Sequence, residues 1–136
     1  MAIKFKVLSL FDGISGAAQA LKELGIECKY FASEIDKYAI EISKKNHPEI
    51  IQIGDITKLM IGHYQGINDL NKFLSWYDQN GVYDTQTNFD LIIGGFPCQS
   101  FSGAGKQKGF EDERGQLFYH LLRILETVRP RYFLFE

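Results

Sequence analysis

A cysteine in the segment from 94 to 102, which reads GGFPCQSFS, is the side chain best suited to act as a nucleophile. Pro97 fixes the backbone in front of Cys98, and glycines and polar residues surround it. A nucleophilic cysteine needs an exposed sulfur, a lowered pKa and a rigid approach. A lone cysteine is more often a small buried hydrophobe, and we interpret Cys28 in GIECKY in that way. The polar turn around Cys98 favours chemistry instead.

Acids and glycines follow other short apolar segments of the chain. FDGISG occupies 11–16, EID occupies 34–36, GDI occupies 54–56, and Glu136 follows YFLF. Each of these alone is typical of a turn or a helix cap. Ligands of open parallel sheets bind outside the carboxyl ends of the strands. Together with GGFPC, the five segments therefore predict a ligand site at one edge of a sheet.

Five apolar segments are predicted to be strands, at 5–10, 30–33, 50–53, 90–93 and 132–135. Runs such as DLII and YFLF are typical of strands buried on both faces of a parallel sheet. Helical stripes lie between them, and their alternation with the strands predicts an α/β fold with a doubly wound, mostly parallel sheet. The predicted inward-facing residues are Ala17, Ala18, Leu21 and Leu24 before Gly25; Tyr38, Ala39 and Ile42 behind the capping Asp36; and Leu117, Phe118, Leu121, Leu122 and Leu125 before Pro130.

Residues 58–88 interrupt this alternation, because strand connections usually take a few residues or one helix. Leu70, Phe73, Leu74 and Tyr77 are spaced for an amphipathic helix between polar flanks. We interpret the segment as an elaborated crossover. A partner-binding insertion is the alternative.

Composition is that of one globular domain of 136 residues, with 45% hydrophobic and 24% charged residues. No apolar run is long enough for a transmembrane helix, and the N-terminus lacks a signal-peptide core, so we expect a cytoplasmic protein without membrane contact. The net charge of -2 neither favours nor excludes nucleic acid. His47, His63 and His120 lack metal-ligand spacing, and we predict no metal site.

The glycines and acids indicate which ligand the edge would take. FDGISG lacks the GxGxxG pattern that lets a backbone approach a pyrophosphate. Glu34 lies 18 residues beyond Gly16, close to the spacing of an acid that binds ribose hydroxyls. Asp55 could accept a hydrogen bond from an exocyclic amine such as that of adenine. These groups fit a nucleoside without a pyrophosphate, and S-adenosylmethionine is such a ligand.

In order along the chain, these segments resemble the motifs of the DNA cytosine-5 methyltransferases. GGFPCQSFS resembles the catalytic Pro-Cys-Gln turn, and SGAGKQKGFEDERGQLF resembles the catalytic loop and helix of the restriction-modification enzymes. FDGISG, EID and GDI are similar to the cofactor motifs, and YFLFE to the start of the Glu-Asn-Val motif. The first motif usually reads Phe-x-Gly-x-Gly-Gly, whereas Ser15 stands in its penultimate place here. The resemblance implies a Rossmann-like methyltransferase fold that stops after the fifth strand.

The resemblance implies S-adenosylmethionine as methyl donor and S-adenosylhomocysteine as product. Phe11 and Ile35 would enclose the adenine ring, Glu34 would bind the ribose and Asp55 the adenine amine. The implied cofactor-binding residues are Phe11, Gly13, Ser15, Gly16, Glu34, Ile35, Asp55, Ile56, Pro97 and Leu117.

The resemblance also implies a reaction on a cytosine that is flipped out of duplex DNA. Cys98 would attack C6 as a thiolate, and Glu136 would hold or protonate N3. C5 would then take the methyl group, and loss of the C5 proton with elimination of the thiol would give 5-methylcytosine. The loop from 99 to 114 would close over the DNA, although a solvated loop is the alternative for its basic residues. The implied DNA-binding residues are Gln99, Ser102, Lys106, Lys108 and Arg114.

The resemblance covers only the N-terminal part of a methyltransferase catalytic domain, at 1–136, and nothing in these residues resembles a target-recognition domain. We therefore expect a bacterial or phage enzyme that contacts double-stranded DNA only when complete, and an isolated chain that is inactive. Half of a split methyltransferase, completed by a second chain, and a non-catalytic cofactor-binding or regulatory module are alternatives. A nicotinamide-dependent oxidoreductase would need GxGxxG and a thiol redox protein CxxC, and neither pattern occurs.

Overall fold

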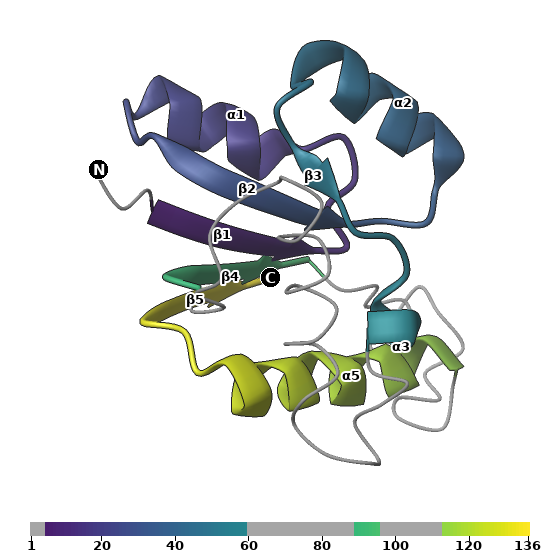
Figure 1. The fold of residues 1–136 in the computed structure, drawn as a ribbon. Helices are drawn as coiled ribbons and strands as arrows, with labels where there is room; N and C mark the ends of the chain where they lie inside the picture. The colour runs from purple at the N-terminus through teal and green to yellow at the C-terminus, as the bar shows by residue number, and fades with distance from the viewer. Residues whose placement is uncertain (1–4, 60–88, 96–112) are drawn as a thin grey trace, which may run out of the picture.

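The computed structural model describes residues 5–59, 89–95 and 113–136. Five parallel strands form one sheet in the order β3-β2-β1-β4-β5 (Figure 1). The strands are β1 (Phe5–Leu10), β2 (Cys28–Ser33), β3 (Ile51–Gln52), β4 (Leu91–Gly94) and β5 (Tyr132–Phe135). The predicted strands and the doubly wound sheet are confirmed. The predicted burial of YFLF on both faces is wrong, because β5 is the outermost strand of the described sheet and Tyr132, Phe133 and Leu134 are exposed. β2 begins two residues earlier than predicted, and β3 is shorter.

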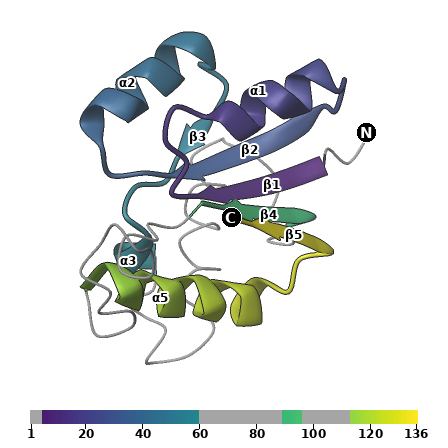
Figure 2. The same ribbon diagram turned by 180° about the vertical axis from the view of Figure 1, so that it is seen from behind.

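In the described part of the chain, four helices cover the two faces of this sheet. α1 (Gly16–Glu23) and α2 (Lys37–Asn46) lie on one face, and α3 (Ile56–Leu59) and α5 (Glu113–Val128) lie on the other (Figures 1 and 2). This three-layer arrangement follows from strands that are apolar on both faces, since each face must be covered by an apolar helix stripe.

Two core clusters lie between the layers. On the α3 and α5 face, Leu8, Phe31 and Ile92 of the strands pack with Leu121 and Ile124 of α5. On the α1 face, the buried residues include Val7, Tyr30 and Ala32 of the strands and Ala18 and Leu21 of α1. Alternate residues of β1 and β2 therefore enter opposite clusters, as the strand period of two requires.

The predicted inward faces of the helices are wrong at four positions. Leu24 follows the last turn of α1 and is 73% exposed. Leu122 of α5 and both Tyr38 and Ile42 of α2 are also exposed. Ser43, next to Ile42, is fully buried instead. The apolar pattern assigned the wrong inward face to α2. This helix contacts its neighbours through the buried hydroxyl of Ser43, which is hydrogen-bonded to Ser15 and Gln52, rather than through an apolar stripe.

Most of the predicted crossover at 58–88, with its amphipathic helix, lies outside the described residues, and only the short helix α3 is described at its start. Within the described part of the chain, none of the helices combines the length and the apolar character that crossing a membrane requires.

Candidate functional site

The carboxyl ends of the five strands lie at one edge of the sheet, because all strand pairs are parallel. From β1 the chain proceeds to β2 and β3 on one side, and later to β4 and β5 on the other. The strand order therefore reverses between β1 and β4. Such a switch point is where open α/β sheets bind ligands.

The loop after β1 is tightly folded at this switch point. Phe11, Gly13 and Ser15 all have left-handed backbone conformations, with φ of 54°, 62° and 69°. Only glycine adopts this conformation without a steric cost, so the other two need surrounding interactions to hold them. The main-chain nitrogen of Asp12 donates to the carbonyl oxygen of Ser33, 3.0 Å away, at the end of β2.

The carboxylate of Glu34 links the ends of β1 and β2. Oε1 accepts a hydrogen bond from the main-chain nitrogen of Gly13 at 2.7 Å. Oε2 accepts from the main-chain nitrogens of Ile35 and Asp36 at 2.8 and 2.9 Å. A carboxylate has about four acceptor positions, so Glu34 retains capacity for a ligand hydroxyl. Ile35 beside it is 73% exposed, as an apolar wall of a ligand site would be.

Asp55, after β3, serves as a local cap. Its Oδ1 accepts hydrogen bonds from both the main-chain nitrogen and the hydroxyl of Thr57, each at 2.8 Å. The cap does not use Oδ2, which is the oxygen that could accept from a ligand amine. The neighbouring Gly54 is tied to β2, because its carbonyl oxygen accepts from the hydroxyl of Ser33 at 2.7 Å.

Glu136 lies directly beyond β5 and is exposed. Its main-chain nitrogen donates to the carbonyl oxygen of Gly94, the last residue of β4, at 3.0 Å. The sheet thus brings Glu136 next to the start of the segment that carries Cys98. Cys98 itself lies outside the described residues, as do Pro97, Gln99, Ser102, Lys106 and Lys108; Arg114 lies in the first turn of α5, and its side chain is not described.

The remaining predicted cofactor residues differ in exposure. Gly16 begins α1 and is exposed. Phe11 and Leu117 are partly buried against the core. Ser15 and Ile56 are 0% and 4% exposed. These values cover main chain and side chain together, so the structure offers a ligand almost no surface of either residue.

Tyr30 is the residue of this region that sequence patterns did not single out. Its hydroxyl donates to Oδ1 of Asp12 at 2.6 Å, although its Cα lies on β2 and its ring is buried. Burial, and then the Asp12 carboxylate, raise the pKa of Tyr30, so it remains a hydrogen-bond donor. A tyrosine inside an apolar strand carries no sequence signal for this contact.

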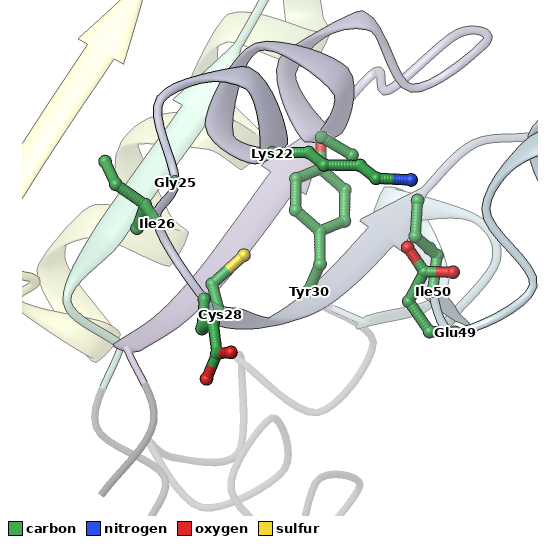
Figure 3. A pocket seen from close by; sticks show the side chains of 9 residues that line it. Lys22, Gly25, Ile26, Cys28, Tyr30, Glu49 and Ile50 are labelled. Carbon is green, nitrogen blue, oxygen red and sulfur yellow. The ribbon is translucent and has the colours of Figure 1, made fainter.

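A cavity of about 470 Å³ lies toward the amino ends of β2 and β3, away from the ligand edge (Figure 3). Cys28 lines it together with Lys22 and Glu49. Burial, and then the charge of Glu49, raise the pKa of the Cys28 thiol. This thiol therefore lacks the activation that a nucleophile needs. Cys28 was predicted to be a small buried residue, and the structure shows it only partly buried.

Comparison with known proteins places these features in a family context. The model of the family described as C-5 cytosine-specific DNA methylase matches residues 5–136. The type II methyltransferase M.NlaIV of Neisseria lactamica is 37% identical, over 98% of this chain and 27% of its own length. The orphan methyltransferase M.Rho11sI of Bacillus phage rho11s is 40% identical, over 98% of this chain and 23% of its own length. The chain thus spans about a quarter of the length of these relatives.

Solved structures agree on the fold. A mutant of DNMT2 from Spodoptera frugiperda is similar over 90% of this chain and 31% of its own, with a TM-score of 0.57 and 28% identity. The Dnmt2 methyltransferase of S. pombe is similar over 98% of this chain and 34% of its own, with a TM-score of 0.64 and 23% identity. The Rossmann-like fold expected from the sequence is therefore confirmed.

Proposed function

Because the chain belongs to the C-5 cytosine-specific DNA methylase family, we propose that it supplies the methyl-donor site and the attacking cysteine of a DNA cytosine-5 methyltransferase. The observation that carries this proposal is the hydrogen bond between Glu34 and Gly13 at the switch point of the sheet. It presents an acid and a tight loop together at the edge where β4 leads into the segment of Cys98.

The residues at this edge fit S-adenosylmethionine. Glu34 keeps acceptor capacity for ribose hydroxyls, Asp55 keeps Oδ2 for the adenine amine, and Ile35 offers an exposed apolar surface. When bound, S-adenosylmethionine supplies an electrophilic methyl group. Phe11, Gly13 and Gly16 would contribute mainly their main chain, since the loop that they form is tightly folded. Ser15, which is fully buried, would contribute by holding this loop in place. Pro97, Ile56 and Leu117 complete the proposed set.

The proposed reaction uses Cys98 and Glu136 on opposite sides of one cytosine ring. The Cys98 thiolate forms a bond to C6, and Glu136 stabilises the negative charge that develops toward N3. C5 takes the methyl group, and the donor leaves as S-adenosylhomocysteine. A base then removes the C5 proton, the bond to the thiol breaks, and 5-methylcytosine results. Glu136 suits its role because its backbone is bonded to Gly94, four residues before Cys98.

We further propose that the 136 residues alone do not methylate DNA. They correspond to about a quarter of the length of the relatives, and DNA recognition would come from polypeptide outside them. Gln99, Ser102, Lys106, Lys108 and Arg114 would contribute contacts to the DNA once it is bound. Whether the additional polypeptide belongs to the same protein or to a second chain distinguishes the ordinary enzyme from a split one.

A transfer assay with radiolabelled S-adenosylmethionine and mixed-sequence duplex DNA tests this proposal. The chain alone should leave the DNA unlabelled. Adding a second polypeptide that carries the part of M.Rho11sI beyond the matched region should give labelled DNA. Cys98→Ser should abolish that labelling, and Cys28→Ser should retain it. Labelling by the chain alone would refute the proposed dependence, and donor binding without labelling in any combination would favour a non-catalytic module.

A further inference from the structure

A continuous chain of hydrogen-bonded side chains lies beneath the loop after β1. The hydroxyl of Tyr30 donates to Oδ1 of Asp12 at 2.6 Å, and the hydroxyl of Ser15 donates to Oδ2 of the same carboxylate. The hydroxyl oxygens of Ser15 and Ser43 are 2.5 Å apart, and Nε2 of Gln52 donates to the Ser43 hydroxyl at 3.1 Å. The chain therefore connects β2, α2 and β3 to one loop.

The directions of these hydrogen bonds follow from the number of protons available. Ser15 has a single hydroxyl proton, which it gives to Asp12. Ser43 must then donate to Ser15 while accepting from Gln52. Every proton in the chain thus points toward the Asp12 carboxylate, from Gln52 on one side and Tyr30 on the other. Aligned hydrogen bonds of this kind strengthen one another.

These groups are removed from water, so each needs its partner. Ser15 and Ser43 are fully buried, and Tyr30 is 3% exposed. In Figure 3 the Tyr30 side chain extends from β2 toward α1, with the hydroxyl at its far end. Tyr30 forms part of the cavity wall. Removing one of these hydroxyls would take a hydrogen-bond partner from a buried or part-buried neighbour.

The conformation of Ser15 indicates that this series of hydrogen bonds stabilises the loop after β1 rather than the start of α1. It occupies the N-cap position of α1, where a serine side chain usually accepts a hydrogen bond from the helix backbone. Here it makes no such bond and adopts a left-handed conformation with φ of 69°. Its hydroxyl is used instead to link Asp12 and Ser43.

We propose that Tyr30 and Ser43 are positioning residues of the methyl-donor site. Tyr30 holds Asp12 directly, and Ser43 holds it through Ser15. On the other side of the loop, Glu34 holds Gly13. The loop is thus fixed from both sides in the conformation that the ligand meets. The inference rests on the proposed function for the identity of the ligand, but the positioning of the loop is independent of it.

Amide hydrogen exchange tests the positioning directly in the full 136-residue chain. Tyr30→Phe removes one hydroxyl and keeps the ring. The Gly13 and Ser15 amides should then exchange about tenfold faster, as the loss of a hydrogen bond to a charged group implies. Exchange rates of amides in the middle of β2 should rise only by the amount that the change in global stability explains. Ser43→Ala should give the same local pattern, and it decides the question if Tyr30→Phe does not fold.

Ile124→Val is the matched control, because Ile124 is buried on the opposite face of the sheet. It should lower global stability without any extra exchange at Gly13 or Ser15. In both hydroxyl variants, exchange at Gly13 and Ser15 could rise only as much as the loss of global stability explains. That result would overturn the inference, because Tyr30 and Ser43 would then stabilise the fold without positioning the loop.

A calorimetric titration with S-adenosylmethionine separates the inference from the proposed function. The dissociation constant should rise about fivefold or more in Tyr30→Phe and stay unchanged in Ile124→Val. If the wild-type chain binds no donor, the proposed donor site fails, and the exchange measurement still decides whether Tyr30 and Ser43 position the loop. Unchanged affinity together with faster loop exchange would overturn their role in donor binding.

Discussion

Glu34 accepts a 2.7 Å hydrogen bond from the main-chain nitrogen of Gly13, so the acid at the end of β2 holds the loop that follows β1. The other oxygen of this carboxylate accepts from the main-chain nitrogens of Ile35 and Asp36. Three backbone donors therefore converge on one side chain. The site is organised by the protein itself, and a ligand would meet an acid whose orientation is already fixed.

Glu34→Gln should lower the free energy of unfolding by about 1–3 kcal/mol, because an amide nitrogen then faces one or more of the backbone donors. Urea unfolding followed by circular dichroism measures the change. Glu41→Gln on the exposed side of α2 is the matched control and should shift stability by less than about 0.5 kcal/mol. Equal effects of the two substitutions would contradict the structural role given to Glu34.

Ser15 offers a separate test of backbone conformation. Ser15→Ala loses the hydroxyl and keeps the left-handed strain, which costs about 1–2 kcal/mol for a residue with a Cβ atom. Ser15→Gly also loses the hydroxyl but relieves that strain. Thermal unfolding should therefore rank the glycine variant above the alanine variant, although both should be less stable than the wild type. The reverse order would mean that residue 15 is not left-handed.

Gly94 lies where α5 and β5 pack closely on the end of β4. A Cβ atom there would lie 3.2 Å from Cδ1 of both Leu121 and Phe135. Gly94→Ala should destabilise the chain by about 1–3 kcal/mol through overpacking. Gly95→Ala is the matched control, since a Cβ atom at Gly95 meets no atom of the described residues within 4 Å. Denaturant midpoints that fall equally in the two variants would show that α5 does not pack closely on the end of β4.

The two cysteines should differ in reactivity. Burial and Glu49 raise the pKa of Cys28, so little of its thiolate forms at pH 7 and its labelling should accelerate as pH rises above that. Iodoacetamide labelling followed by mass spectrometry should modify Cys98 first at pH 7. Each cysteine can be followed alone in Cys28→Ser and Cys98→Ser. Faster labelling of Cys28 at pH 7 would argue against Cys98 as the nucleophile.

Sequence patterns located the strands and the edge that their carboxyl ends share, because both depend on local regularities. Buried parallel strands are apolar at successive positions, and their carboxyl ends must share one edge. The capping role of Asp36 was also predictable from the sequence, and its side chain accepts hydrogen bonds from the main-chain nitrogens of Tyr38 and Ala39. The inward face of α2 could not be predicted from the sequence. Ser43 replaces Ile42 there because its hydroxyl bonds to groups distant in the chain, and no local periodicity encodes such a partner.

β5 is the last strand in the sheet order and presents exposed apolar side chains. Tyr132, Phe133 and Leu134 are 56%, 64% and 64% exposed. An uncovered apolar edge strand promotes association between chains, so the 136-residue chain should form oligomers at micromolar concentration. Leu134→Lys should shift the sedimentation profile toward monomer.

Leu24→Lys is the control for this effect, since it adds the same charge at an exposed leucine after α1. It should leave association unchanged. Equal suppression by both lysines would attribute association to net charge rather than to β5.

We propose that these strand ends form a methyl-donor site, and calorimetric titration of S-adenosylmethionine into the chain measures donor binding there. Saturable binding of about one donor per chain is predicted. Glu34→Ala should weaken it at least about tenfold, and Glu41→Ala should leave it unchanged. Absence of binding to a chain shown to be folded, or equal binding by the Glu34→Ala variant, would contradict the claim.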